Sequence, residues 1–156
     1  MKTKLVAFTL LASISAFASF AQDAADPFAD VVETRHGLML QMASDLGTLG
    51  GMAKGTAAYD QAAATQAASN IAAIASVLSM AQFPAGSETG AAADSYALAD
   101  IWTKQDDFLS KITDLNNAAG MMKMAAATDA NAIKGSMAQL GGACSACHKS
   151  YRQPES

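Results

Sequence analysis

The segment DANAIKGSMAQLGGACSACHKSY, residues 129–151, decides the fold of this chain. Its apolar and sulfur-containing side chains recur at steps of three and four residues, which is the spacing of one face of an α-helix. The residues that share this face are Ile133, Met137, Leu140, Cys144, Cys147, His148 and Tyr151. The segment therefore predicts an amphipathic helix whose inner face carries both cysteines of the chain.

Within this helix, residues 144–148 read Cys-Ser-Ala-Cys-His and contain the only two cysteines of the 156 residues. C-x-x-C-H is the attachment motif of c-type haem. Two thiols at this spacing can add to the two vinyl groups of one haem, and the histidine can bind its iron. Positions 144, 147 and 148 lie on one side of a helix, so all three groups can reach one macrocycle. We predict one covalent haem c, tethered by Cys144 and Cys147, with His148 as the proximal ligand.

Two other uses of the cysteines are weaker. A disulfide between Cys144 and Cys147 would close a very short loop and constrain the unfolded chain little. Together with His36 and His148 the cysteines form a Cys2His2 set that could bind zinc. Adjacent residues such as Cys147 and His148, however, are poor joint ligands of one small ion. No hydrolytic constellation or phosphate loop is recognisable.

The rest of the chain also favours helices, since it contains nine methionines but only three prolines. We expect helices over 26–52, 59–80, 94–127 and 129–151, the first with Asp26 as cap and Pro27 in its opening turn. A long loop is expected at 83–90. Four helices with short connections predict an all-α fold, an antiparallel four-helix bundle with the haem near the C-terminal helix. The expected inward residues of the first three helices are Val32, Arg35, Met39, Met42, Leu46 and Leu49; Ala63, Ala67, Ile71, Ile74, Val77 and Leu78; and Leu98, Ile101, Phe108, Ile112, Leu115, Ala119 and Met122.

The N-terminus has the pattern of an export signal. Lys2 and Lys4 precede an uncharged, mostly apolar run over 5–20, with small residues before the acidic stretch that follows. We predict a signal peptide over 1–21, cleaved after Ala21 or alternatively after Ala18, and one domain over 22–156. An uncleaved membrane anchor is the alternative, but the run is short for a membrane span.

The charge of the chain limits its partners. Fourteen acidic residues exceed ten basic ones, and the net charge at pH 7 is −4. Loss of the two lysines with the signal makes the mature chain more acidic still. This argues against nucleic acid and against anionic lipid surfaces as partners. No segment beyond the N-terminal run is long and apolar enough to cross a membrane, so we expect no membrane insertion after signal removal.

Several motifs in order make the chain resemble the cytochrome c′ family, the class II c-type cytochromes. They are Arg35, Phe-Pro-Ala-Gly-Ser at 83–87, Ile-Trp at 101–102, the C-terminal C-x-x-C-H and Arg152 four residues after its histidine. The stretch 46–55 also resembles the end of the family's first helix. The resemblance implies a haem-bearing bundle in the Gram-negative periplasm, and homodimers that form through the first two helices.

The family's distal haem position lies four residues after its first-helix arginine, which places Met39 there. Open-site members carry leucine or another non-ligating residue and bind small gases. Met39 instead implies a six-coordinate, low-spin His/Met haem, with a higher reduction potential than bis-His ligation. Core packing is the other use of a methionine here. Met42 is the second candidate ligand, and His36, expected on the outside of the bundle, is the third.

Two arginines complete the candidate site. Arg35 could pair with a haem propionate, line the distal pocket or be a surface charge. Arg152 could act on the proximal imidazole or a propionate, or be solvated at a fraying end. The resemblance implies a carrier of single electrons between redox partner proteins, and not an enzyme. The alternatives are nitric oxide or carbon monoxide binding at an open or displaceable site, haem-free copper or zinc binding, and a peroxidase, which a bound methionine would block.

Overall fold

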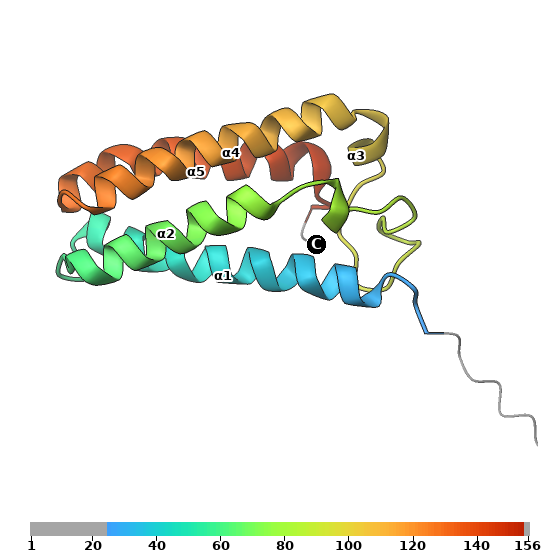
Figure 1. Ribbon diagram of the computed structural model, residues 1–156, viewed down its shortest axis with the longest axis horizontal. Helices are drawn as coiled ribbons and strands as arrows, with labels where there is room; N and C mark the ends of the chain where they lie inside the picture. The colour runs from blue at the N-terminus through green and yellow to red at the C-terminus, as the bar shows by residue number, and fades with distance from the viewer. Residues whose placement is uncertain (1–24, 155–156) are drawn as a thin grey trace, which may run out of the picture.

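The computed structural model describes residues 25–154 (Figure 1). Four long helices form the bundle: α1 (Ala29–Lys54), α2 (Gln61–Val77), α4 (Gln105–Ala126) and α5 (Ala130–Tyr151). Between α2 and α4 lie the 3-10 turn η1 (Met80–Gln82) and the single-turn helix α3 (Asp100–Thr103). Helix α1 packs against α2 and α5, and α4 packs against the same two helices. The all-α antiparallel four-helix bundle is confirmed.

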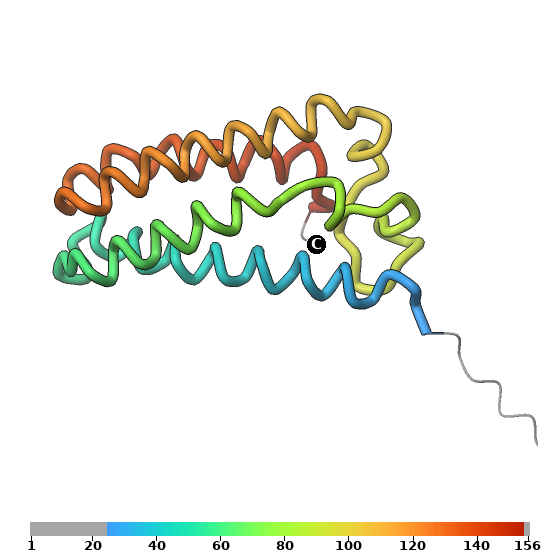
Figure 2. Tube along the Cα trace, viewed as in Figure 1, coloured from blue at the N-terminus to red at the C-terminus, as the bar shows by residue number. Residues whose placement is uncertain are grey.

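Residues 83–99 form the connecting loop between η1 and α3. The loop lies at the end of the bundle where the chain also ends (Figure 2). The prediction of one helix over 94–127 is therefore wrong at its start. Asp94 has a φ of 54°, which a right-handed helix cannot contain. The backbone instead pairs with the end of α5: Tyr96 O accepts from Gln153 N at 2.8 Å, and Leu98 N donates to Tyr151 O at 3.0 Å.

The first helix begins at Ala29, slightly later than predicted. Asp26 caps the turn before it, since its Oδ1 accepts from Phe28 N at 2.8 Å. Its Oδ2 accepts from Ala93 N at 2.6 Å, which fastens the start of the helix to the connecting loop. The helix ends at Lys54, followed by Gly55 with a φ of 73°, the left-handed C-cap that glycine favours.

Helix α2 is shorter than the predicted 59–80, and its inner face differs from the prediction in two positions. Asp60 caps it by accepting from Ala63 N at 3.0 Å. Ala63 itself is exposed, and Val77 is 53% exposed. Alanine provides little amphipathic contrast, so the sequence pattern does not fix the rotation of this helix. The buried residues of the helix are Ala64, Ala67, Ala68, Ile71 and Ala75.

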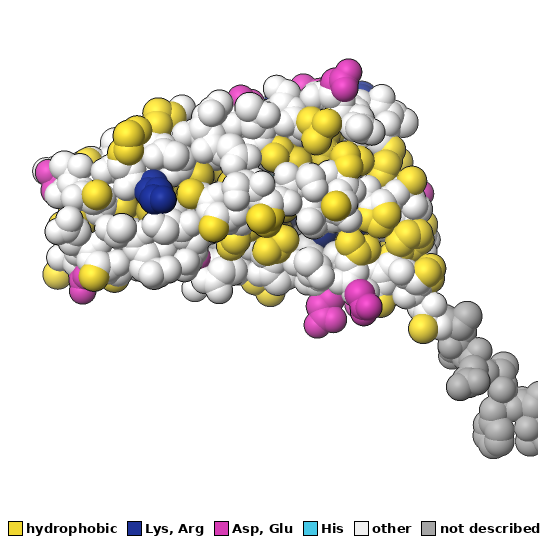
Figure 3. Space-filling model, in the orientation of Figure 1, with side chains coloured by type: hydrophobic (Ala, Val, Ile, Leu, Met, Phe, Trp, Pro, Cys, Tyr) yellow, Lys and Arg dark blue, Asp and Glu magenta, His cyan; other side chains and the backbone are white. Residues whose placement is uncertain are grey.

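The core fills the bundle between the four long helices. Leu49, Ile101, Met122, Ile133 and Leu140 are essentially inaccessible to water. On the face shown in Figure 3, charged side chains are few, and apolar ones gather towards the end that carries the connecting loop. Among residues 25–154, no helix combines the length and the hydropathy that a bilayer span requires.

Candidate haem-binding site

A cavity of about 710 Å³ lies at the end of the bundle closed by the connecting loop. This volume falls within the range of about 300–1,000 Å³ typical of cofactor and ligand pockets. Helix α1, the connecting loop, α3, α4 and α5 with its following tail all contribute to the wall. The lining residues are Arg35, His36, Met39, Leu40, Phe83, Tyr96, Ala97, Ile101, Phe108, Cys147, His148, Tyr151, Arg152, Gln153 and Pro154.

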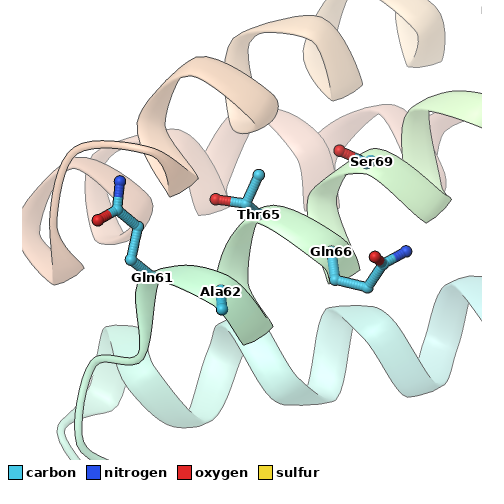
Figure 4. A pocket seen from close by; sticks show the side chains of 5 residues that line it. All are labelled: Gln61, Ala62, Thr65, Gln66 and Ser69. Carbon is cyan, nitrogen blue, oxygen red and sulfur yellow. The ribbon is translucent and has the colours of Figure 1, made fainter.

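A second hollow, of about 470 Å³, lies on the surface of α2 alone (Figure 4). Its lining consists of Gln61, Ala62, Thr65, Gln66 and Ser69. None of these side chains is a thiol, an imidazole or a charged group, and none is a predicted site residue. The chemistry of this chain is concentrated in the larger cavity.

The last two turns of α5 bring the C-x-x-C-H motif to that cavity. Cys147 and His148 line it, while Cys144 packs against the core. Both cysteines are free and half-buried, so the disulfide is not formed. Burial raises the pKa of Cys147 to about 11, with a further contribution from Cys144. Burial also raises the pKa of Cys144.

This arrangement is poorly suited to binding zinc. Metal binding by cysteine requires thiolates, and burial of both thiols disfavours that charged form. In the part of the chain that the structure describes, no three histidine, cysteine or acidic side chains are grouped as a metal site. The Cys2His2 set with His36 and His148 is therefore not assembled.

Met39 on α1 lines the same cavity as His148 on α5. The two candidate axial ligands thus face one space from two different helices. Met42, the second candidate, is buried in the core cluster and does not line the cavity. His36 was expected on the outside but is half-buried and lines the cavity, because its ring packs near Tyr96 with centroids 5.7 Å apart.

Arg35 is 5% exposed, so its interpretation as a surface charge is wrong. Its Nη1 donates to Ser87 Oγ at 2.8 Å and to Gln82 O at 3.2 Å. Its Nη2 donates to Ser87 O and to Ser95 Oγ, both at 3.1 Å. The guanidinium also lies 5.0 Å from the centroid of the Phe83 ring, a cation–π distance. Burial lowers the pKa of Arg35.

Arg152 directly follows α5, and its backbone nitrogen donates to His148 O at 3.0 Å. Its side chain is exposed and borders the cavity. The terminus at this point is not fraying, since Tyr151 and Gln153 on either side are hydrogen-bonded to the connecting loop. Arg152 therefore lies at the rim of the cavity, one helical turn beyond His148.

Aromatic rings form the inner wall of the cavity. Phe108 packs edge-on against Phe83 at 4.9 Å and against Tyr151 at 5.2 Å between centroids. The indole nitrogen of Trp102 donates to Phe83 O at 3.0 Å, which helps to fix the position of Phe83 in this wall. Such a wall keeps water from a flat apolar group while the thiols and imidazole stand beside it. The donor set, the cavity volume and the aromatic wall together fit a haem tethered by two cysteines.

Sequence reasoning missed Ser87 and Ser95 as partners of Arg35. A signal for them existed, since an arginine on the apolar stripe of an amphipathic helix must find buried acceptors. Tyr96 and Phe108 were likewise not identified as cavity residues. The place of Tyr96 depends on the path of the connecting loop, which no local pattern determines, whereas Phe108 lies on the predicted inward stripe of α4.

Comparisons with known proteins agree with this site. The family model described as Cytochrome C' matches residues 30–152. Cytochrome c-554 of Cereibacter sphaeroides is 48% identical over 149 residues, covering 96% of this chain and 97% of the relative. Cytochrome c-556 of Agrobacterium tumefaciens is 37% identical over 121 residues, covering 78% of this chain and 95% of the relative.

A solved structure, cytochrome c prime from Shewanella frigidimarina, superimposes with a TM-score of 0.72 at 35% identity. The superposition covers 81% of this chain and 97% of that one. Sequence, fold and site geometry therefore converge. The chain belongs to the cytochrome c′ family of four-helix-bundle electron carriers and carries one covalent haem c.

Proposed function

We propose that this protein carries single electrons through a six-coordinate, low-spin haem whose axial ligands are His148 and Met39. The observation that carries the proposal is that these two side chains line one cavity from helices α5 and α1. The haem supplies the one-electron Fe(III)/Fe(II) chemistry, and the protein supplies its ligands and surroundings.

Each residue of the candidate site has a definite role in this proposal. Cys144 and Cys147 hold the macrocycle to α5. The imidazole of His148 and the thioether of Met39 would hold the iron from opposite helices in both redox states, so little rearrangement would accompany electron transfer. Phe83 and Phe108 exclude water and lower the local dielectric. Thioether ligation and burial both raise the reduction potential.

The compared relatives give this proposal modest support. Two of them carry the names cytochrome c-554 and c-556 and not cytochrome c′. The alternative is an open or displaceable iron that binds nitric oxide or carbon monoxide. A solved cytochrome c prime mutant from Alcaligenes xylosoxidans, 27% identical to this chain with a TM-score of 0.71, is a nitric oxide complex.

An absorption spectrum of the purified holoprotein, reduced with and without carbon monoxide, tests the proposal. A low-spin reduced spectrum that carbon monoxide does not change is the expected result. Met39→Leu should become high-spin and bind carbon monoxide, whereas Met42→Leu, on the same helix but in the core, should match the wild type. A six-coordinate low-spin Met39→Leu protein would refute the ligand assignment, and His36 would be the next ligand to test.

The proposal also covers the location, the partners and the oligomeric state of the protein. We propose export to the periplasm by the signal peptide 1–21, which lies outside the described residues. There the acidic domain 22–156 would exchange electrons with redox partner proteins, without nucleic acid or membrane insertion, and as a homodimer through the first two helices. It would catalyse no turnover of its own. The mass of the haem protein from a periplasmic extract would show where the signal is cleaved.

A further inference from the structure

Arg35 is a buried cation whose hydrogen bonds all go to neutral oxygens. The acceptors are a hydroxyl and a carbonyl of Ser87, the hydroxyl of Ser95 and the carbonyl of Gln82. In the described range neither ion pair of the structure involves Arg35. A guanidinium has four terminal N–H groups, and these four bonds use all of them. Arg35 thus uses four of its five N–H groups to hold the connecting loop and the end of η1.

The same loop is bonded to the end of α5. Leu98 N donates to Tyr151 O at 3.0 Å, and Gln153 N donates to Tyr96 O at 2.8 Å. The hydroxyl of Thr89 donates to Gln153 Oε1 at 2.6 Å. Within the loop, Ser95 Oγ donates to Ser87 O at 2.6 Å and accepts from Ala97 N at 3.3 Å. The loop therefore joins Arg35 on α1 to the residues that follow His148 on α5.

This connection matters because the cavity separates α1 from α5 at this end. Direct packing of the two helices occurs further along, where a Cβ at Gly50 would lie 3.7 Å from the Met137 methyl carbon. At the cavity end, Arg35 is one helical turn before Met39, and Tyr151 is about one turn after His148. A hydrogen-bonded path connects the two helices at this end and runs from Arg35 through Ser95 and Leu98 to Tyr151. This path is here called the brace.

We propose that the brace positions Met39 relative to His148, and that Arg35 is a positioning residue which decides how firmly Met39 holds the iron against an incoming diatomic ligand. The proposal rests on the ligand assignment made above. Hydrogen bonds to a charged donor are stronger than neutral ones, and the rigid fork of arginine fixes its acceptors in one geometry. A looser brace would let the α1 end move away from α5, so Met39 would leave the iron more often.

Two variants loosen the brace in different ways. Arg35→Lys keeps the charge but loses the fork, and Ser95→Ala removes one hydroxyl that both accepts and donates within the brace. Ser76→Ala is the matched control, because Ser76 is exposed and its hydroxyl bonds only to Ala73 O in its own helix, at 2.7 Å. The measurements are the rate of carbon monoxide binding to the reduced holoprotein and the hydrogen exchange of the Ala97 and Leu98 amides.

We expect both brace variants to remain six-coordinate but to bind carbon monoxide about tenfold faster, equivalent to about 1.4 kcal/mol. Their amides at 97 and 98 should exchange faster, and Ser76→Ala should match the wild type in both measurements. Faster exchange with an unchanged carbon monoxide rate would overturn the proposal, because the brace would then be structural only. Unchanged exchange and binding in Ser95→Ala would overturn it as well.

The failure of the ligand assignment gives a different result. In that case the wild type itself is high-spin and binds carbon monoxide at once, before any brace variant is compared. Ser95→Ala also guards against a fold failure of Arg35→Lys, since it removes no charge and leaves the other three bonds of Arg35 in place.

Discussion

The phenol of Tyr151 donates a 2.5 Å hydrogen bond to Asp107 Oδ2, which ties the last turn of α5 to the first turn of α4. The ring of Tyr151 is buried against Phe108, whereas the Asp107 carboxylate is about half exposed and also lies 3.5 Å from Lys111 Nζ. The bond therefore joins a buried wall of the haem cavity to the surface of the bundle. It holds the C-terminal turn that carries His148 in place.

The Tyr151–Asp107 bond should make stability fall in alkali. Burial and the carboxylate of Asp107 raise the pKa of Tyr151 to about 12, above its usual 10. A raised pKa means that the folded state favours the protonated phenol, so its contribution is complete below pH 10 and is lost as the pH rises towards 12. Urea unfolding of the holoprotein between pH 8 and 12 should show this loss, and Tyr151→Phe should show less of it. Parallel curves for the two proteins would contradict the assignment.

The same bond also predicts that stability is lost as the pH falls into the acid range. The hydrogen bond from Tyr151, together with Lys111, lowers the pKa of Asp107 from its usual 3.8. A lowered pKa means that the folded state favours the carboxylate, so its contribution is present above pH 3.8 and is lost as the pH falls through the folded value. Asp107→Asn should therefore flatten the stability curve below pH 4. Asp114→Asn, at an exposed position of the same helix, is the control.

Local patterns in the sequence predicted most of the helices and the first half of the connecting loop, 83–90, but not its second half. The cavity is reached by Cys147, His148 and Met39 because each lies on the apolar stripe of a long helix. Such a stripe can be recognised from the spacing of apolar residues in the sequence. Tyr96 and Leu98 fall in the predicted helix, yet their backbone groups bond to Gln153 and Tyr151 at the end of α5. Those partners are more than 50 residues away, so no local propensity could reveal them. His36 was misplaced for the same reason, since Tyr96 belongs to that loop.

Core packing predicts a large effect at Leu49 and almost none at Met124. Leu49 is fully buried among the bundle helices, so Leu49→Ala should lower the free energy of unfolding by about 2–5 kcal/mol through lost contacts and a cavity. Met124 lies on α4 at 68% exposure and does not line the haem cavity, and Met124→Ala should change stability by less than about 0.5 kcal/mol. Chemical denaturation of the holoproteins measures both. Equal losses in the two variants would contradict the packing of the core described above.

Two glycines should respond to alanine with opposite signs. Gly86, in the connecting loop, has a φ of 93°, and a Cβ there would lie 3.0 Å from Phe28 Cζ. Gly86→Ala should therefore destabilise the protein by about 1–3 kcal/mol, through backbone strain and displacement of the Phe28 ring. Gly120 is exposed within α4, and a Cβ there would have no neighbour within 4 Å. Gly120→Ala should stabilise by about 0.5–1 kcal/mol, because alanine loses less backbone entropy in a helix.

Thermal unfolding of the two glycine variants in holo form gives the comparison, and the spectrum shows whether the loop effect reaches the haem. Ser87, next to Gly86, accepts two of the hydrogen bonds from Arg35, so strain at Gly86 should loosen the loop on the Met39 side of the cavity. Gly86→Ala should therefore bind carbon monoxide faster in the reduced state, whereas Gly120→Ala should not. A destabilised Gly86→Ala protein with a wild-type carbon monoxide rate would mean that the connecting loop supports the fold without controlling the distal ligand.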